Sequence, residues 1–410
     1  MSNKNASATN LSPEVFARER YINRMEANEK AAAAGGAYDQ GVPPYRAKNG
    51  LFAGKKKWWW IAGALLIVAI IAVAVGIAVS KSNKKDSATG AVKSDKNDPS
   101  NFEKDPDLHQ SFYAMCYTPQ DAQYDQGCKA SIDAVIEDVQ LMSQLTTRLR
   151  LYGADCGIPS LVLEAIEKTK VNMTVYLATW LPQPSATDAT ATYQRQVSEL
   201  TSAIKQYGVD HVDGVTVGNE YLLNGGSETD LISKMADMRT TLKGLNLPKT
   251  IPVGTADAGS MVTTSLAQGS DYVMANVHAW FGELPVDQAA GWVWSYTANQ
   301  EPASALQASP APELFIAETG WPTGANATQF ETLGAAQAGI PELNTFLDTY
   351  VCQANQNITA GDKFSKYFFF EFSDETWKDA MYGGVEAHWG LFTADRKLKT
   401  GLTLPNCSHP

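Results

Sequence analysis

Residues 58–80 set the first limit on how this chain can fold, because they form 23 consecutive uncharged residues, WWWIAGALLIVAIIAVAVGIAVS. As an α-helix rising about 1.5 Å per residue, the segment would extend roughly 34 Å, enough to cross a hydrocarbon core of about 30 Å. The lysines 55–57 precede the tryptophans 58–60, whose indoles favour the headgroup level. A cleaved signal peptide would carry a shorter apolar run nearer the N-terminus. The sequence therefore predicts a retained transmembrane helix.

Charge divides the rest of the chain into three zones. Residues 1–57 carry ten Lys and Arg against five Asp and Glu, residues 81–108 carry six of each sign, and residues 109–410 carry 17 basic against 33 acidic side chains. The first zone predicts a disordered tail and the second a polar stalk between membrane and domain. The acidic third zone argues against a general nucleic-acid binder, whose affinity would come from Lys and Arg.

The side of the membrane follows from cysteines and sequons, because lysines on the two sides of the apolar segment nearly balance. All five cysteines follow the segment, as expected of a domain in an oxidising compartment. Four Asn-x-Ser/Thr sequons also follow it, at Asn172, Asn326, Asn357 and Asn406, although Asn5 and Asn10 begin sequons too. We therefore expect a cytosolic N-terminus and an N-glycosylated domain outside the cytosol.

From about residue 110, short apolar runs alternate with amphipathic segments, which is typical of an α/β fold. The predicted strands are 112–117, 147–152, 173–180, 212–219, 251–256, 272–279, 313–318 and 367–372. The predicted helices are 130–145, 159–169, 190–207, 228–243, 286–300 and 331–354. This alternation favours a (β/α)8 barrel over 109–410. A doubly wound sheet is the alternative, but no Gly-rich phosphate loop follows a predicted strand.

Carboxylates and aromatic residues gather where the predicted strands end, which is the face on which barrels of this kind carry their sites. Those ends are Tyr117, Tyr152, Trp180, Asn219 with Glu220, His278 with Trp280, Glu318, and Glu371. Cleavage of a glycosidic bond uses this combination: one carboxylic acid protonates the leaving oxygen, a carboxylate attacks or activates water, and sugar rings stack on aromatic faces.

Glu220 and Glu318 are the predicted catalytic pair. Glu220 follows the run VTVGN, whose Asn219 is placed to hydrogen-bond a sugar 2-hydroxyl, and Glu318 ends FIAE before a turn that contains Trp321. A single Glu after a strand is more often a solvated or salt-bridged residue. Two of them, on predicted strands 4 and 7, favour catalysis.

The motifs around these residues resemble those of a known family. VTVGNEY (215–221) and IAETGWPTG (316–324) are similar to the acid/base and nucleophile motifs of glycoside hydrolase family 17, the fungal and plant β-1,3-glucanases. RLYGADC (150–156), NVHAWF (276–281), FFFEFSDETWK (368–378) and EAHWGLF (386–392) resemble further blocks of the fungal branch. The resemblance covers about 110–407 in the same order.

The resemblance implies a (β/α)8 barrel without cofactor or metal, retention of configuration, Glu220 as acid/base and Glu318 as nucleophile. Retention requires carboxyl groups about 5–5.5 Å apart. The anchored arrangement is similar to that of membrane-bound fungal enzymes of this family, which implies a single-pass type II protein of the plasma membrane that faces the cell wall. Three residues depart from the family pattern, Ala279, Ser373 and Thr376, and affect subsite shape more than mechanism.

Further residues are candidates for binding β-1,3-glucan, each with a structural alternative. Arg150, Tyr152 and Asp155 would orient the carboxylates or bind a glucose hydroxyl, or form a core Tyr with a structural Arg–Asp pair. His278 and Glu371 would bind or tune the site, or be structural. The remaining candidates for sugar contact are Tyr117, Trp180, Trp280, Trp321, Trp377, Lys378 and Trp389, of which at least one tryptophan is expected in the core. Glu375, Glu386 and His388 would line or brace the far cleft.

The five cysteines cannot all pair within the chain. The family resemblance implies disulfides Cys128–Cys156 and Cys352–Cys407, with Cys116 a buried thiol in the first strand. No Cys or His pair has the spacing of metal ligands.

Three functions remain open from the sequence. The leading one is an endo-acting β-1,3-glucan hydrolase of a fungal cell wall. The second is a glucanosyltransferase, in which another glucan hydroxyl replaces water. The third is a non-catalytic glucan-binding receptor, which retention of both Glu220 and Glu318 argues against. Specificity for mixed β-1,3-1,4-glucan is a lesser alternative.

Overall fold

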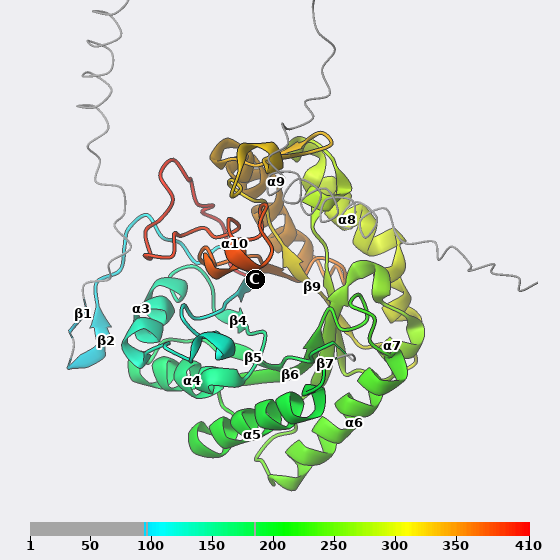
Figure 1. Ribbon diagram of the computed structural model, residues 1–410. Coiled ribbons are helices and arrows are strands. Elements are labelled where there is room, and N and C mark those ends of the chain that lie inside the picture. Colours follow the sequence, from blue (N-terminus) through cyan, green and yellow to red (C-terminus); the bar gives the residue numbers. More distant parts are fainter. Residues whose placement is uncertain (1–93, 96, 184–185) are drawn as a thin grey trace, which may run out of the picture. The chain divides into compact units, whose positions relative to one another are not determined.

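The computed structural model describes residues 94–410 except 96 and 184–185. Eight parallel strands close into a barrel in the order β12, β3, β4, β5, β6, β7, β8, β9 (Figure 1). These strands are β3 (Met115–Cys116), β4 (Arg148–Arg150), β5 (Thr174–Thr179), β6 (Val212–Asn219), β7 (Val253–Ala258), β8 (Tyr272–Asn276), β9 (Glu313–Thr319) and β12 (Tyr367–Phe369). The prediction of a (β/α)8 barrel is confirmed, with one strand inside or overlapping each predicted strand range.

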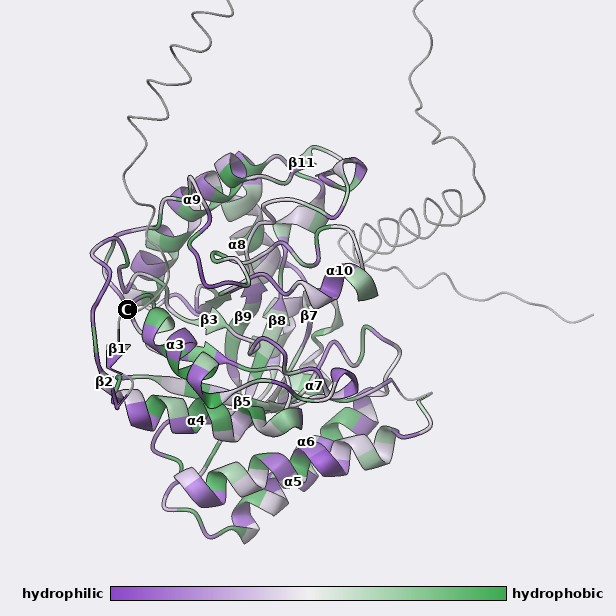
Figure 2. Cartoon of the chain, turned by 60° about the vertical axis from the view of Figure 1, so that its left-hand side comes forward, coloured by the Kyte–Doolittle hydropathy of each residue, from purple (hydrophilic) through white to green (hydrophobic). Residues whose placement is uncertain are grey.

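Helices surround the barrel and follow the strands in turn (Figure 1). They are α3 (Ile132–Met142), α4 (Ile158–Thr169), α5 (Ala189–Tyr207), α6 (Glu228–Gly244), α7 (Thr264–Gln268), α8 (Ala289–Asn299), α9 (Ile340–Thr359) and α10 (Trp377–Met381). Hydroxyl caps start several of them: Ser131 accepts from the backbone N–H of Ala134, and Ser227 accepts from that of Asp230. Figure 2 shows hydrophobic residues concentrated on the strands and polar residues interspersed along the helices.

Aromatic rings fill the barrel interior toward the amino ends of the strands. Tyr176 lies edge-on to three neighbours, with ring centroids 5.2 Å from Tyr272, 5.6 Å from Phe315 and 5.5 Å from Phe368. Edge-to-face packing of this kind suits the charge distribution of aromatic rings. Because helices cover the outside and rings fill the inside, the strands are buried on both faces, and all six residues of β7 are buried.

One predicted helix begins later than expected. Residues 331–339, predicted as the start of a helix, contain a hairpin of β10 (Thr332–Leu333) and β11 (Ala336–Gln337). Gly334 makes the turn with a φ of 59°, and the backbone N–H of Ala335 donates to Glu283 O over 3.0 Å. The helix starts only at Ile340, where Pro341 suits the first turn.

The predicted stalk, residues 81–108, is corrected in its second part. A hairpin of β1 (Ser94–Asp95) and β2 (Asp98–Phe102) forms there and packs on the domain. Gln140 Nε2 donates to Pro99 O over 2.7 Å, and the backbone N–H of Asp105 donates to Gln144 Oε1 over 2.7 Å. Leu108 is buried in the core.

The predicted cytosolic tail (1–57), the predicted transmembrane helix (58–80) and the start of the stalk lie outside the described residues. Within residues 94–410, apart from 96 and 184–185, no helix is both long and apolar enough to cross a membrane.

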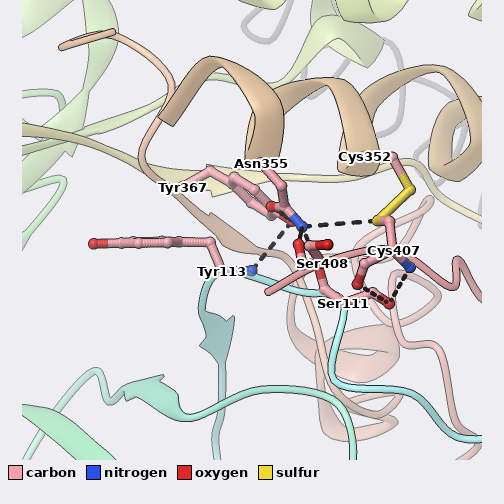
Figure 3. The surroundings of a disulfide bond; sticks show 7 residues. All are labelled: Ser111, Tyr113, Cys352, Asn355, Tyr367, Cys407 and Ser408. Atoms are coloured by element: carbon pink, nitrogen blue, oxygen red, sulfur yellow. Dashed lines mark hydrogen bonds between the residues drawn. A yellow bond between two sulfur atoms is a disulfide. The ribbon is translucent and has the colours of Figure 1, made fainter. Parts of the chain in front are cut away.

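Both predicted disulfides form, and Cys116 is a buried free thiol. Cys128–Cys156 joins the segments that follow β3 and β4. Cys352–Cys407 ties the end of the chain to α9 (Figure 3). Beside it, Asn355 Nδ2 donates to Ser111 O over 2.6 Å and to Ser408 O over 2.9 Å, so this end of the chain lies next to the segment that leads into β3.

Candidate active site

Glu318, on β9 near its carboxyl end, is held between two side chains from other strands. Arg150, on β4, donates from Nη1 to Glu318 Oε1 over 2.8 Å. His278, two residues after β8, lies with Nε2 3.0 Å from the other carboxyl oxygen. Both oxygens of this buried carboxyl group therefore have a polar partner.

These partners decide the charge of Glu318. Burial alone would raise the pKa of Glu318, but the hydrogen bond with His278 and the positive charge of Arg150 outweigh it and hold this pKa well below the usual range. An ionised carboxylate is what a nucleophile requires.

Glu220 directly follows β6 and adopts a left-handed backbone conformation, with a φ of 52°. Asn276, at the end of β8, donates from Nδ2 to Glu220 Oε1 over 3.2 Å and to Asn219 Oδ1 over 3.3 Å. Arg150 Nη2 donates to the same oxygen of Asn219 over 2.7 Å. Glu220 and Glu318 are thus joined through a continuous chain of hydrogen bonds.

Arg150 is the centre of that chain. Besides Glu318 and Asn219, it contacts the hydroxyl of Tyr152 over 3.0 Å, and its guanidinium lies 4.4 Å from the centre of the Tyr152 ring. The guanidinium fork reaches two acceptors at once, which a lysine ammonium on a flexible stem does less well. Among the predicted alternatives, the orienting role of Arg150 and Tyr152 fits these contacts.

A second group of carboxyls lies after β12. Glu371 is buried, and burial followed by the charge of Glu375 holds the pKa of Glu371 well above its usual range, although the charge of Lys378 opposes this. Lys378 forms an ion pair with Glu375, and its Nζ lies 4.9 Å from the centre of the Phe370 ring. Burial and neighbouring charges thus move the pKa values of the two carboxyls in opposite directions, that of Glu371 upward and that of Glu318 downward.

Several predicted sugar-contacting residues are corrected. Trp280 and Trp321 are 0% exposed, and their rings pack against each other with centroids 5.6 Å apart. Trp389 is buried beside His278, with ring centroids 4.8 Å apart. Tyr117 is buried as well, and its hydroxyl donates to Asp138 over 2.7 Å. These rings are buried and offer no face to a sugar.

Asp155 pairs with a different arginine from the one expected, Arg195 in place of Arg150. Its carboxyl oxygens accept from Arg195 Nε over 2.6 Å and Nη2 over 3.0 Å, and from Gln196 Nε2 over 3.1 Å, so the structural pair is Asp155–Arg195. His388, predicted to brace the far cleft, lies with Nε2 3.3 Å from Asp379 Oδ1.

Two predicted tryptophans remain accessible. Trp180 follows β5 and is 45% exposed, and the partly buried Trp377 starts α10. Tyr382, 53% exposed, has its ring centroid 6.2 Å from that of Trp377. Accessible aromatic side chains therefore lie in the segments that follow β5 and β12.

Sequence reasoning missed Asn276 and Asp257. Both lie in or beside predicted strands, where a polar residue after a buried run is a weak signal. Asp257, on β7, accepts from the backbone N–H of Leu222 over 2.8 Å and of Leu223 over 3.1 Å. Burial raises the pKa of Asp257 to about 7, and the charge of Glu220 adds to this, whereas these backbone hydrogen bonds oppose it.

No group of three His, Cys, Asp or Glu side chains could hold a metal ion among the residues that the structure describes.

The family model of the BtgE/BtgC glycoside hydrolase domain matches residues 114–390. The chain belongs to this family. The predicted resemblance to fungal glucanases is thus confirmed for the domain.

Relatives of this BtgE/BtgC domain carry consistent names. The putative glucan endo-1,3-beta-glucosidase btgC of Aspergillus niger is 35% identical over 342 residues, which are 78% of this chain and 48% of the relative. The probable glucan endo-1,3-beta-glucosidase btgC of Aspergillus fumigatus is 37% identical over 320 residues, 73% of this chain and 44% of the relative. The chain thus spans about half the length of the curated relatives it matches.

Solved structures agree with the fold of the BtgE/BtgC domain. The glycoside hydrolase family 17 beta-1,3-glucanosyltransferase of Rhizomucor miehei matches with a TM-score of 0.58 and 24% identity, over 72% of this chain and 98% of that one. An endo-laminarinase of Formosa matches with a TM-score of 0.56 and 19% identity, over 70% and 85%. At these identities the match establishes the shared barrel alone.

Proposed function

We propose that the domain is a retaining β-1,3-glucan hydrolase in which Glu318 is the nucleophile and Glu220 the acid/base. Glu220 protonates the leaving oxygen while Glu318 attacks the anomeric carbon, and a glycosyl ester forms on Glu318. Glu220 then removes a proton from water, which attacks the ester and releases the sugar with its original configuration.

The observation that carries this proposal is the pair of contacts to Glu318. Arg150 and His278 occupy both carboxyl oxygens and keep the group ionised inside a buried site, where an unpaired charge would be costly. Asn219, which receives hydrogen bonds from both Arg150 and Asn276, lies beside Glu220 as a partner for the sugar 2-hydroxyl.

The relatives' names support β-1,3-glucan as the substrate, because both Aspergillus proteins are named glucan endo-1,3-beta-glucosidase. Trp180, after β5, and Trp377, at the start of α10, offer accessible aromatic faces for sugar rings.

Product analysis on a defined series of reduced and unreduced laminari-oligosaccharides tests the proposal. We expect the wild type to release shorter sugars with retained configuration and Glu318→Gln to lose at least about a thousandfold in kcat, since the nucleophile is gone. Glu313→Gln is the matched control, because Glu313 is exposed at the opposite end of the same strand. Undiminished activity of Glu318→Gln would remove the nucleophile assignment, and binding without cleavage on prolonged incubation would favour a glucan receptor.

Transfer is the second candidate, and the exposure of Trp180 favours it. An acceptor sugar stacked on this ring would compete with water for the glycosyl ester, so its hydroxyl would form a new glycosidic bond. In that case products longer than the starting oligosaccharide appear, and Trp180→Ala shortens them while hydrolysis continues.

We further propose that residues 58–80 anchor the domain on the outer face of the plasma membrane as a single-pass type II protein. The two disulfides and the exposed sequons Asn172, Asn326 and Asn406 support an oxidising, glycosylating compartment; Asn357 is half-buried. Protease treatment of intact spheroplasts tests the orientation: a protected N-terminal epitope and a digested domain are expected, and the reverse pattern would overturn it.

A further inference from the structure

Asp257 lies on β7, next to β6, the strand that Glu220 directly follows. The two strands pair in parallel with Asn219 opposite Ala256, and the backbone N–H of Glu220 donates to Ala256 O over 3.1 Å. Asp257 is 1% exposed, and its carboxyl group contacts the backbone of the turn that begins at Glu220.

The Asp257 carboxyl group holds that turn from below. Its Oδ2 accepts from the backbone N–H of Leu222 over 2.8 Å, and its Oδ1 accepts from those of Leu223 over 3.1 Å and Ala258 over 3.0 Å. Three backbone donors converge on one buried side chain, and two of them belong to residues that closely follow Glu220.

The turn needs such support, because Glu220 adopts a φ of 52°. A left-handed conformation is unfavourable for a residue with a side chain and persists only where its surroundings fix it. Two hydrogen bonds close the turn locally, from Asn224 N to Glu220 O over 3.1 Å and from Gly226 N to Tyr221 O over 2.8 Å. The carboxyl of Asp257 joins this turn to the barrel.

We infer that Asp257 is a positioning residue for Glu220, which fixes the strained turn that carries the acid/base and places a second carboxyl group beside it. The inference rests on the proposed function. It assigns to β7 a part in the reaction that neither the sequence motifs nor the contacts of Glu318 indicate.

The other charged groups near Glu220 are engaged elsewhere, which singles out Asp257 as its carboxyl neighbour. From β4 and from the segment after β8, Arg150 and His278 both contact Glu318. On α6, Asp230 accepts from the hydroxyl of Tyr221 over 2.7 Å. Asp257 is therefore the buried carboxyl on the β7 side of Glu220.

Burial raises the pKa of Asp257 to about 7, and the charge of Glu220 adds to that rise, so the two carboxyl groups lie within electrostatic range of each other. Loss of one acceptor oxygen from Asp257 should loosen the turn and misplace the acid/base, which lowers kcat more than it changes KM.

Steady-state kinetics on a laminari-oligosaccharide, for Asp257→Asn and the wild type, tests the inference. Asparagine keeps the shape but removes one of the two acceptor oxygens that hold the turn. We expect kcat to fall roughly tenfold with a smaller change in KM, because the acid/base is misplaced while the sugar contacts remain. Asp287→Asn is the control, since it removes one carboxylate at an exposed position before α8 and should leave both constants unchanged.

A measurement without substrate covers the case in which Asp257→Asn does not fold. In wild-type protein labelled with 15N-leucine, the amide signals of Leu222 and Leu223 should shift with pH as Asp257 titrates against them. Amides that do not respond, or a folded Asp257→Asn variant whose kcat matches the wild type, would overturn the inference. A wild type that neither cleaves nor transfers would instead remove the proposed function first.

Discussion

Arg150 carries more of the site than any other single side chain. It is buried, it donates to Glu318 from one nitrogen and to Asn219 from another, and it contacts Tyr152. Its charge therefore reaches the proposed nucleophile, and its fork fixes the residue beside the proposed acid/base. Only a guanidinium holds two donor nitrogens in one plane so that they reach acceptors on two different residues.

Arg150→Lys should test geometry at constant charge. A lysine ammonium can reach Glu318 or Asn219 but does not reproduce the fork, so the two carboxyls lose their common tether. We expect kcat to fall about a hundredfold with a smaller change in KM, because small misplacements of reacting groups are expensive. Steady-state kinetics on laminari-oligosaccharides measures this. A variant with wild-type kcat would show that the tether has no part in catalysis.

Arg150 also affects the acidic limb of the pH profile, through its contact with Glu318. Arg150 and His278 hold the pKa of Glu318 below its usual range, so the nucleophile stays ionised in mildly acidic solution. We therefore expect kcat/KM to be maintained at pH values below about 4.3, the ordinary pKa of a glutamic acid. Loss of either partner raises this pKa, so His278→Gln should move the acidic limb to higher pH. A limb that stays in place in this variant would contradict the account.

The elements of the barrel were largely predictable from sequence, and their exceptions have local causes. Apolar runs such as VTVGN and FIAE marked β6 and β9 because both faces of a barrel strand are buried. The helix expected over 331–354 lost its first turns to a hairpin, since Gly334 adopts the left-handed conformation that its turn requires. Pattern also could not say that Trp280 and Trp321 face the core, because a strand end offers no periodicity to follow.

Close approach between β7 and β8 gives a test at this scale. A Cβ at Gly254 would lie 2.3 Å from the backbone oxygen of Tyr272 and 2.4 Å from its ring. Gly254→Ala should therefore lower the free energy of unfolding by about 3 kcal/mol or more, as overpacking in a closed barrel cannot relax. Urea denaturation of the folded domain gives the value.

Gly244→Ala serves as the control for that substitution. Gly244 ends α6 with no atom within 4 Å of the added methyl, so alanine should be neutral or stabilise by up to about 1 kcal/mol. Equal stability of the two variants would show that β7 and β8 tolerate wider separation.

At the scale of the molecule, the two disulfides lie on different sides of the barrel. Cys352–Cys407 closes a segment of 55 residues next to Ser111, before β3, whereas Cys128–Cys156 closes 28 residues among the segments that follow β3 and β4. The former is remote from the strand ends that carry Glu220 and Glu318, and the latter is on their side.

Cys352→Ser with Cys407→Ser should separate stability from activity. Loss of this cross-link should cost about 4 kcal/mol by the chain-entropy estimate, with kcat at low temperature unchanged. Thermal unfolding and kinetics on the same preparation measure both. The matched pair, Cys128→Ser with Cys156→Ser, should cost slightly less stability but lower kcat, and an equal loss of kcat in both pairs would contradict the distinction.

The distribution of the site over the strands bears on how the enzyme can be divided. The half from β3 to β6 contributes Arg150 and Glu220, and the half from β7 to β12 contributes His278 and Glu318. Neither half alone contains both carboxyls. The exposed segment 248–250 between them is a natural breakpoint, so two separately produced fragments would regain turnover only by reassembly. Recovered activity in such a split enzyme would then report closure of the barrel directly.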